Sequence, residues 1–116
     1  MAKIPAKIQD AYLHDILEAA RLIRGYMAGV SCDEFWDNSE KRDAVAMRIS
    51  VLGESARRVN AATEKALPTV PFKSLGGMRN RIAHDYGAVD FKIVWDVTQN
   101  AIEPLIASLE AFQTTR

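Results

Sequence analysis

The chain has 116 residues, and its 15 Lys or Arg and 15 Asp or Glu residues give a formal net charge of zero. This length fits a single domain, residues 1–116, with a buried core, and 48% hydrophobic with 26% charged residues is typical of a soluble globular protein. The neutral charge excludes a diffuse positive field for nucleic acid, so any RNA contact needs a local basic patch or a groove between two subunits.

The compartment is predicted from cysteine usage and from the hydrophobic runs. The single Cys32 cannot form an intramolecular disulfide, which favours a reducing environment. Residues 1–7 lack the apolar stretch of a signal peptide, and no uncharged apolar run approaches the roughly 18 residues that a membrane span needs. We therefore expect a soluble, cytoplasmic protein.

The first helix is predicted over residues 5–27. Pro5 suits a first helical turn, and Gly29 stands where a C-terminal cap would fall. Apolar residues then recur at steps of three and four, which places them on one face of the helix. They are Ile8, Tyr12, Ile16, Ala19, Ile23 and Tyr26.

A short connection over residues 31–38 precedes the second helix, predicted over about 40–65. Ser39 is a candidate N-cap for it, and Asn38 is the alternative. Gly53 lies in the helix interior, where glycine costs up to about 1 kcal/mol relative to alanine. A glycine at that position predicts the close approach of another backbone.

The second half of the chain predicts two more helices. The third begins near residues 72–74, after a proline-rich connection, and ends by Tyr86, before Gly87. The fourth has Asp90 as a plausible N-cap and is kinked by Pro104. The fold class is therefore all-α, a bundle of four or five helices. Its predicted core contains Ile16, Ile23, Val45, Ile49, Leu52, Val59, Val94, Ala101 and Leu105.

The chemically informative segment is 78–87, Met-Arg-Asn-Arg-Ile-Ala-His-Asp-Tyr-Gly. On a helix, Asn80 and His84 share a face, whereas Arg79 lies about 140° from His84 and must reach round the helix end. His84 near a helix C-terminus and near an arginine is suited to exchange protons close to neutrality. From spacing alone, a surface helix with a hydrogen-bonded histidine is the commoner explanation, and His14 is assigned no role.

The spacing Arg79-x4-His84-x-Tyr86 resembles the motif of the HepT-like toxins, a branch of the HEPN ribonuclease superfamily. Asn80 fits the habit of that superfamily of placing a small polar residue after the arginine. The likeness covers nearly the whole chain, with one small departure at Ser55, where the family often has alanine. Its other stretches are Tyr12 to Leu17, Phe35 with Asp37, residues 43–45, 53–56, 77–80, 89–90 and 94–95.

The resemblance implies a metal-independent endoribonuclease that acts as the toxin of a type VII-like toxin–antitoxin pair. Its antitoxin is then a minimal nucleotidyltransferase that transfers AMP to Tyr86 and silences the toxin. His84 would act as base and acid on RNA, Arg79 would stabilise the charge on the phosphate, and Asn80 would orient the phosphate or His84. The sequence contains no usual zinc spacing, so no metal and no other cofactor are expected.

A homodimer or higher oligomer is also expected. Each chain supplies one histidine of this type, and a two-fold dimer would bring a second one and more positive charge to a shared cleft. The first alternative function is a non-catalytic HEPN subunit that binds its nucleotidyltransferase partner or a nucleotide. A purely structural helical bundle is the remaining alternative, and it leaves the clustering at residues 79–86 without a reason.

Overall fold

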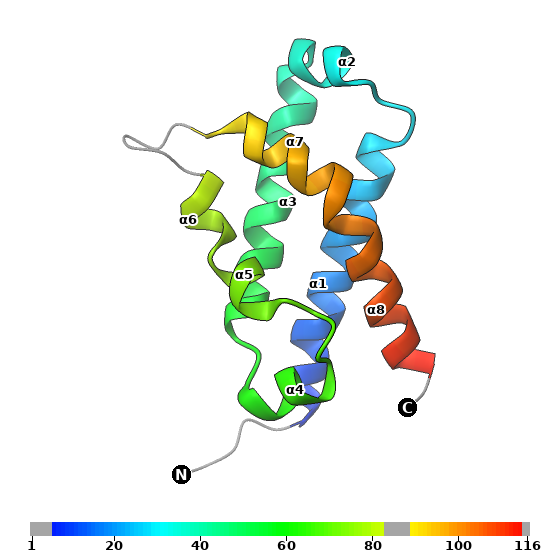
Figure 1. Ribbon diagram of the computed structural model, residues 1–116, viewed down its shortest axis with the longest axis vertical. Helices are drawn as coiled ribbons and strands as arrows, with labels where there is room; N and C mark the ends of the chain where they lie inside the picture. Colours follow the sequence, from blue (N-terminus) through cyan, green and yellow to red (C-terminus); the bar gives the residue numbers. More distant parts are fainter. Residues whose placement is uncertain (1–5, 83–88, 115–116) are drawn as a thin grey trace.

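The computed structural model describes residues 6–82 and 89–114, and in these ranges the chain forms a bundle of eight helices (Figure 1). The helices are α1 (Ala6–Met27), α2 (Cys32–Asp37), α3 (Ser39–Arg57), α4 (Ala61–Ala66), α5 (Phe72–Gly76), α6 (Met78–Ile82), α7 (Phe91–Asn100) and α8 (Ile102–Thr114). The prediction of an all-α bundle is confirmed. Helix α3 is central, because α1, α5, α6 and α7 all pack against it.

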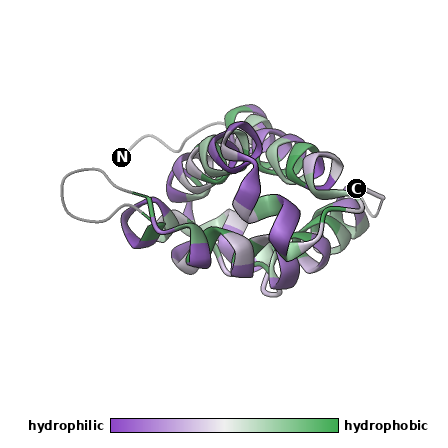
Figure 2. Ribbon diagram, turned by 90° about the horizontal axis from the view of Figure 1, so that it is seen from above, coloured by the Kyte–Doolittle hydropathy of each residue, from purple (hydrophilic) through white to green (hydrophobic). Residues whose placement is uncertain are grey.

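The core lies between α1, α3, α7 and α8, as the spacing of apolar residues predicted. Eight of the nine predicted core residues are buried, and Ala101 is partly buried against them. Phe35 is fully buried as well, and its ring meets those of Trp36 and Trp95 at centroid distances of 5.9 and 5.4 Å. Figure 2 shows hydrophilic and hydrophobic residues alternating around the helices, as amphipathic helices require.

The connection predicted at residues 31–38 contains a helix, α2. Ser31 and Glu34 form a reciprocal capping box, in which each side chain accepts a hydrogen bond from the backbone N–H of the other residue. Asn38, the alternative candidate, is the N-cap of α3, and its side chain accepts from the N–H of Lys41 at 2.9 Å. Gly29 takes a φ of +70° after α1, as expected for a C-terminal cap.

The prediction of a single helix over residues 40–65 is wrong, because the structure has two helices there, α3 and α4. The break lies at Asn60, whose backbone N–H donates to Oε1 of Gln9 at 2.8 Å instead of continuing the helix. The Asn60 side chain then accepts from the N–H of Thr63 and starts α4. Gln9 is itself 4% exposed, so a buried contact with α1 fixes this break.

The other two predicted helices are also divided. The third is interrupted at Gly77, between α5 and α6, and its predicted end at Tyr86 lies outside the described residues. The fourth begins as predicted, because the Asp90 side chain accepts from the N–H groups of Lys92 and Ile93. It breaks at Ala101, since Pro104 has no N–H to offer to the carbonyl of Asn100.

Gly53 makes the close backbone contact that its place inside a helix predicted. A Cβ built on Gly53 would lie 2.8 Å from the carbonyl oxygen of Leu75, closer than real Cβ atoms come to other atoms. The absence of a side chain therefore lets α5 lie directly on α3. Backbone atoms form this contact, so a larger residue cannot be relieved by a change of rotamer.

We expect Gly53→Ala to lower the free energy of unfolding by about 1–3 kcal/mol, because the methyl group forces α3 and α5 apart. Gly25→Ala is the matched control, since Gly25 also lies in a helix and a Cβ there meets nothing within 4 Å. The control should be stabilised by up to about 1 kcal/mol through helix propensity. Urea unfolding followed by circular dichroism measures both, and equal effects of the two substitutions would contradict the contact.

Candidate active site

Two buried residues fix the orientation of α6. Met78 and Ile82 are 3% and 2% exposed and lie four residues apart, on the face of the helix that packs into the core. The residues between them therefore point outward, and Arg79, Asn80 and Arg81 are exposed. The local pattern of one apolar residue per helical turn thus presents the arginine of the motif to solvent.

Arg79 lies in a groove between α3 and α6. Two hollows of about 420 and 260 Å³ make up this groove, and they share Met47, Ser50 and Arg79. The first extends along α3 to Glu54, and the second extends to Asp43, Ile82 and Val89. The groove therefore runs the length of α6 and reaches both described ends of segment 83–88.

Those two ends lie together. The N–H of Asp90 donates a hydrogen bond to the carbonyl of Ile82 at 2.5 Å, and Asp90 also caps α7. The end of α6 and the start of α7 thus lie next to each other (Figure 1). Ile82 and Val89 both line the groove. His84 and Tyr86, the two other residues of the predicted motif, belong to segment 83–88 and lie outside the described residues.

Asn80 lines a different hollow from Arg79. Its hollow has a volume of about 490 Å³ and is formed by the end of α3, by α4 and by α5. Successive residues of a helix point about 100° apart, which accounts for this divergence. Arg79 and Asn80 are therefore neighbours on α6 that face two separate depressions of the surface.

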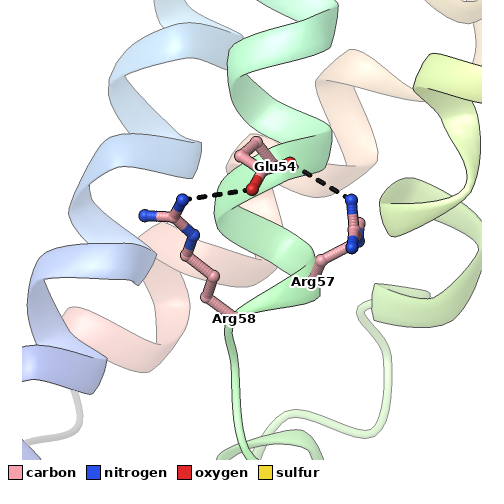
Figure 3. A network of polar contacts seen from close by, with 3 residues as sticks. All are labelled: Glu54, Arg57 and Arg58. Carbon is pink, nitrogen blue, oxygen red and sulfur yellow. Dashed lines mark hydrogen bonds and ion pairs between the residues drawn. The ribbon is translucent and has the colours of Figure 1, made fainter.

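Positive charge is concentrated in one stretch of the sequence although the whole chain is neutral. Residues 54–82 contain six Lys or Arg and two Asp or Glu, a formal charge of +4. One of the two carboxylates, Glu54, is shared by Arg57 at 3.3 Å and Arg58 at 3.1 Å (Figure 3). All three side chains are at least 37% exposed, so these ion pairs are each worth at most about 1 kcal/mol. The hollow at Asn80 is lined by Arg57, Lys73 and Glu64, whereas the groove is lined by Arg79 together with the carboxylates Asp43 and Glu54.

The α3 side of the groove was not predicted from the sequence. Met47 and Val51 are 63% and 37% exposed, and both line the hollow that contains Arg79. Their signal was present, because they are large apolar residues four apart that fall off the core stripe of α3. An apolar pair outside the core stripe indicates an exposed face of a helix.

Neither a metal cluster nor a membrane helix occurs in the part of the chain that the structure describes. Within residues 6–82 and 89–114, no group of three or more His, Cys, Asp or Glu side chains is placed to hold a metal ion. No helix in the same ranges is both long and apolar enough to cross a membrane.

Comparison with known proteins shows which family the chain resembles. The family model described as "Ribonuclease HepT-like" matches residues 16–112. A Methanocaldococcus jannaschii protein with the name "Putative RNase MJ1216" is 30% identical over 107 residues, which cover 92% of this chain and 88% of the relative. "Probable ribonuclease HepT" of Thermococcus cleftensis is 25% identical over 99 residues, covering 85% of this chain and 90% of the relative. No solved structure matches significantly.

Proposed function

Because this chain belongs to the HepT-like ribonuclease family, we propose that it is an endoribonuclease that cuts RNA without a metal ion, using Arg79 and His84. One observation carries this proposal. Ile82 and Val89, the described residues on either side of the segment that holds His84, both line the groove in which Arg79 is exposed. The complete Arg-x4-His-x-Tyr spacing lies inside the matched region. We therefore place the binding site of the scissile phosphate in this groove.

The proposed reaction uses the 2′-hydroxyl of the RNA as nucleophile. The His84 imidazole takes the proton from this hydroxyl, and the 2′-oxygen forms a bond with phosphorus while the bond to the 5′-oxygen breaks. The leaving 5′-oxygen receives a proton from an imidazolium, and the products are a 2′,3′-cyclic phosphate and a 5′-hydroxyl. Arg79 binds the non-bridging oxygens, where negative charge builds up in the transition state. Asn80 was predicted to orient the scissile phosphate or His84, but it lines a different hollow from Arg79, so we assign it contact with the RNA strand beside the scissile phosphate.

Two subunits would complete this site. One imidazole cannot accept the first proton and donate the second in a single step, so His84 of the partner subunit supplies the other group. The exposed Met47 and Val51 beside Arg79 support a dimer on this face, since a second copy would cover them. The RNA would then run in the cleft between the two copies.

Regulation would act on Tyr86. In this proposal the chain is the toxin of a toxin–antitoxin pair, and its partner is a minimal nucleotidyltransferase. The Tyr86 oxygen forms a bond with the α-phosphorus of ATP, pyrophosphate leaves, and the phenolic proton is released. The attached phosphodiester then competes with RNA for Arg79, through a charge-assisted hydrogen bond worth about 1.5–3 kcal/mol.

We expect His84→Ala and Arg79→Ala to abolish RNA cleavage, and Arg79→Lys to restore little of it because the planar fork is lost. Arg79→Ala should change the free energy of unfolding by less than about 0.5 kcal/mol, since the side chain is exposed. The assay uses a labelled RNA with EDTA present, and His14→Ala is the control that should remain active. Undiminished cleavage by His84→Ala would remove the catalytic assignment and favour the binding-only alternative.

We expect Tyr86→Phe to escape AMP transfer and to keep cleaving RNA when it is produced with the nucleotidyltransferase. Phenylalanine lacks the acceptor oxygen, and the phenol is neither the base nor the acid of the reaction. Intact mass and RNA cleavage are measured for the wild type and for the Tyr12→Phe control, both of which should gain AMP and lose activity. If Tyr86→Phe also gains AMP and is silenced, the switch lies on another residue.

We expect Met47→Glu to convert a dimer into a monomer and to lower cleavage at least tenfold, because a buried unpaired carboxylate is strongly unfavourable at an interface. Ile8→Glu is the matched control, since Ile8 is an exposed apolar residue on α1. Light scattering reports the oligomeric state of each. A wild-type chain that is a fully active monomer, or a Met47→Glu variant that stays dimeric, would contradict this arrangement.

A further inference from the structure

The hollow that Asn80 faces has features of its own beyond the motif. Its volume of about 490 Å³ falls within the range of about 300–1,000 Å³ that small-molecule sites occupy. It lies at the junction of α3, α4, α5 and α6, next to the groove that contains Arg79. Its lining residues are Ala56, Arg57, Glu64, Phe72, Lys73, Gly76, Gly77 and Asn80.

Gly76 and Glu54 determine where the side chain of Arg57 lies beside this hollow. A Cβ built on Gly76 would lie 2.6 Å from Cγ of Arg57, so only a glycine leaves room for the arginine stem to cross α5. One terminal nitrogen of Arg57 then contacts Glu54 at 3.3 Å (Figure 3). A guanidinium has five N–H donors, so this contact leaves others free to bind a ligand.

The chemistry of the lining favours a phosphate group. Arg57 and Lys73 are cations, and Asn80 adds an amide donor, whereas Glu64 is the one carboxylate among the lining residues. Phe72 is the one aromatic residue among them, but it is 3% exposed, so its ring offers no face on which a base could stack. A phosphate oxygen is therefore a better fit than a nucleobase.

We propose that the hollow lined by Arg57, Lys73 and Asn80 binds a backbone phosphate of the RNA strand adjacent to the phosphate that is cut. This inference rests on the proposed function for the identity of its ligand. Arg79 and Asn80 are consecutive on α6 and face the groove and the hollow respectively, so a single strand crossing α6 presents one phosphate to each. Basic surfaces that follow the backbone in this way are usual for single-stranded nucleic acid.

The test measures RNA binding apart from catalysis. All proteins carry His84→Ala, and the fluorescence anisotropy of a labelled single-stranded oligoribonucleotide is measured at several salt concentrations. We expect Arg57→Gln with Lys73→Gln to weaken binding roughly three- to tenfold. The slope of log affinity against log salt should fall by about 0.7 for each phosphate that the variant no longer neutralises.

The matched control removes the same charge from another face. Arg21 and Arg24 lie on α1 and pair with Glu110 and Glu103 of α8. Arg21→Gln with Arg24→Gln should change binding less than twofold, and circular dichroism checks that both double variants are folded. If both double variants weaken RNA binding equally, the effect comes from the net charge of the protein and not from the hollow, and the proposal is overturned.

A substitution that removes a negative charge instead of a positive one gives a second test of RNA binding at the hollow. Glu64→Gln removes the carboxylate of the hollow and should tighten RNA binding more than Glu18→Gln, which removes an exposed carboxylate from α1. No difference between these two variants would contradict a phosphate at this position. The ligand source is tested with AMP: if Arg57 and Lys73 matter as much for AMP as for the oligoribonucleotide, the hollow is a nucleotide pocket and the strand assignment is wrong.

The cleavage assay keeps this inference apart from the proposed function. If the double variant fails to bind RNA while the wild type binds but cleaves no RNA, the hollow stands as a phosphate site and the nuclease proposal fails. For cleavage, Arg57→Gln with Lys73→Gln is also made with His84 intact. If the wild type cleaves RNA and this double variant binds and cleaves as the wild type does, the nuclease proposal stands and the hollow has no part in it.

Discussion

The contact between Gly53 and the carbonyl of Leu75 sets the geometry on which the candidate site depends. A methyl group at residue 53 would lie 2.8 Å from that oxygen, so α5 rests on α3 only because this position lacks a side chain. The position of α5 also constrains the position of α6, since Gly77 is the single residue between the two helices. Met78 and Ile82 then bury one face of α6, and the opposite face presents Arg79 over the groove. A backbone contact between α3 and α5 thus determines where a solvent-exposed arginine stands.

The helix boundaries could be predicted from the sequence where neighbouring residues determine them, but not where contacts between distant parts of the chain determine them. Helix α1 and the cap at Asp90 follow from short-range rules, and both are confirmed. Pro104 was expected only to kink the last helix, which is instead divided into α7 and α8. The break at Asn60 depends on Gln9, which is 51 residues away, so no local pattern could reveal it. Helix α2 was missed for a different reason, because its capping box at Ser31 was visible but was interpreted as part of a connection.

The candidate site divides in the same way. The motif itself could be recognised from spacing and family resemblance, and Arg79 is exposed beside a groove as such a role requires. The α3 wall of the groove has a local signal, because Met47 and Val51 fall outside the core stripe of α3. The hollow at Asn80 has none, since it joins residues that lie far apart in the chain. His84 and Tyr86 lie outside the described residues, so their assigned roles rest on the motif and on the family.

The carboxylate of Glu54 has a physical reason to remain on a basic face. Arg57 and Arg58 are adjacent, and two neighbouring guanidiniums without a counter-charge repel each other. Glu54 contacts one terminal nitrogen of each, which holds the two groups on opposite sides of one carboxylate (Figure 3). The three side chains together keep a single positive charge, and Arg57, which lines the hollow, keeps N–H donors beyond the one that contacts Glu54. The carboxylate thus lowers the charge of the surface by one unit and favours the side-chain position in which Arg57 lines the proposed phosphate site.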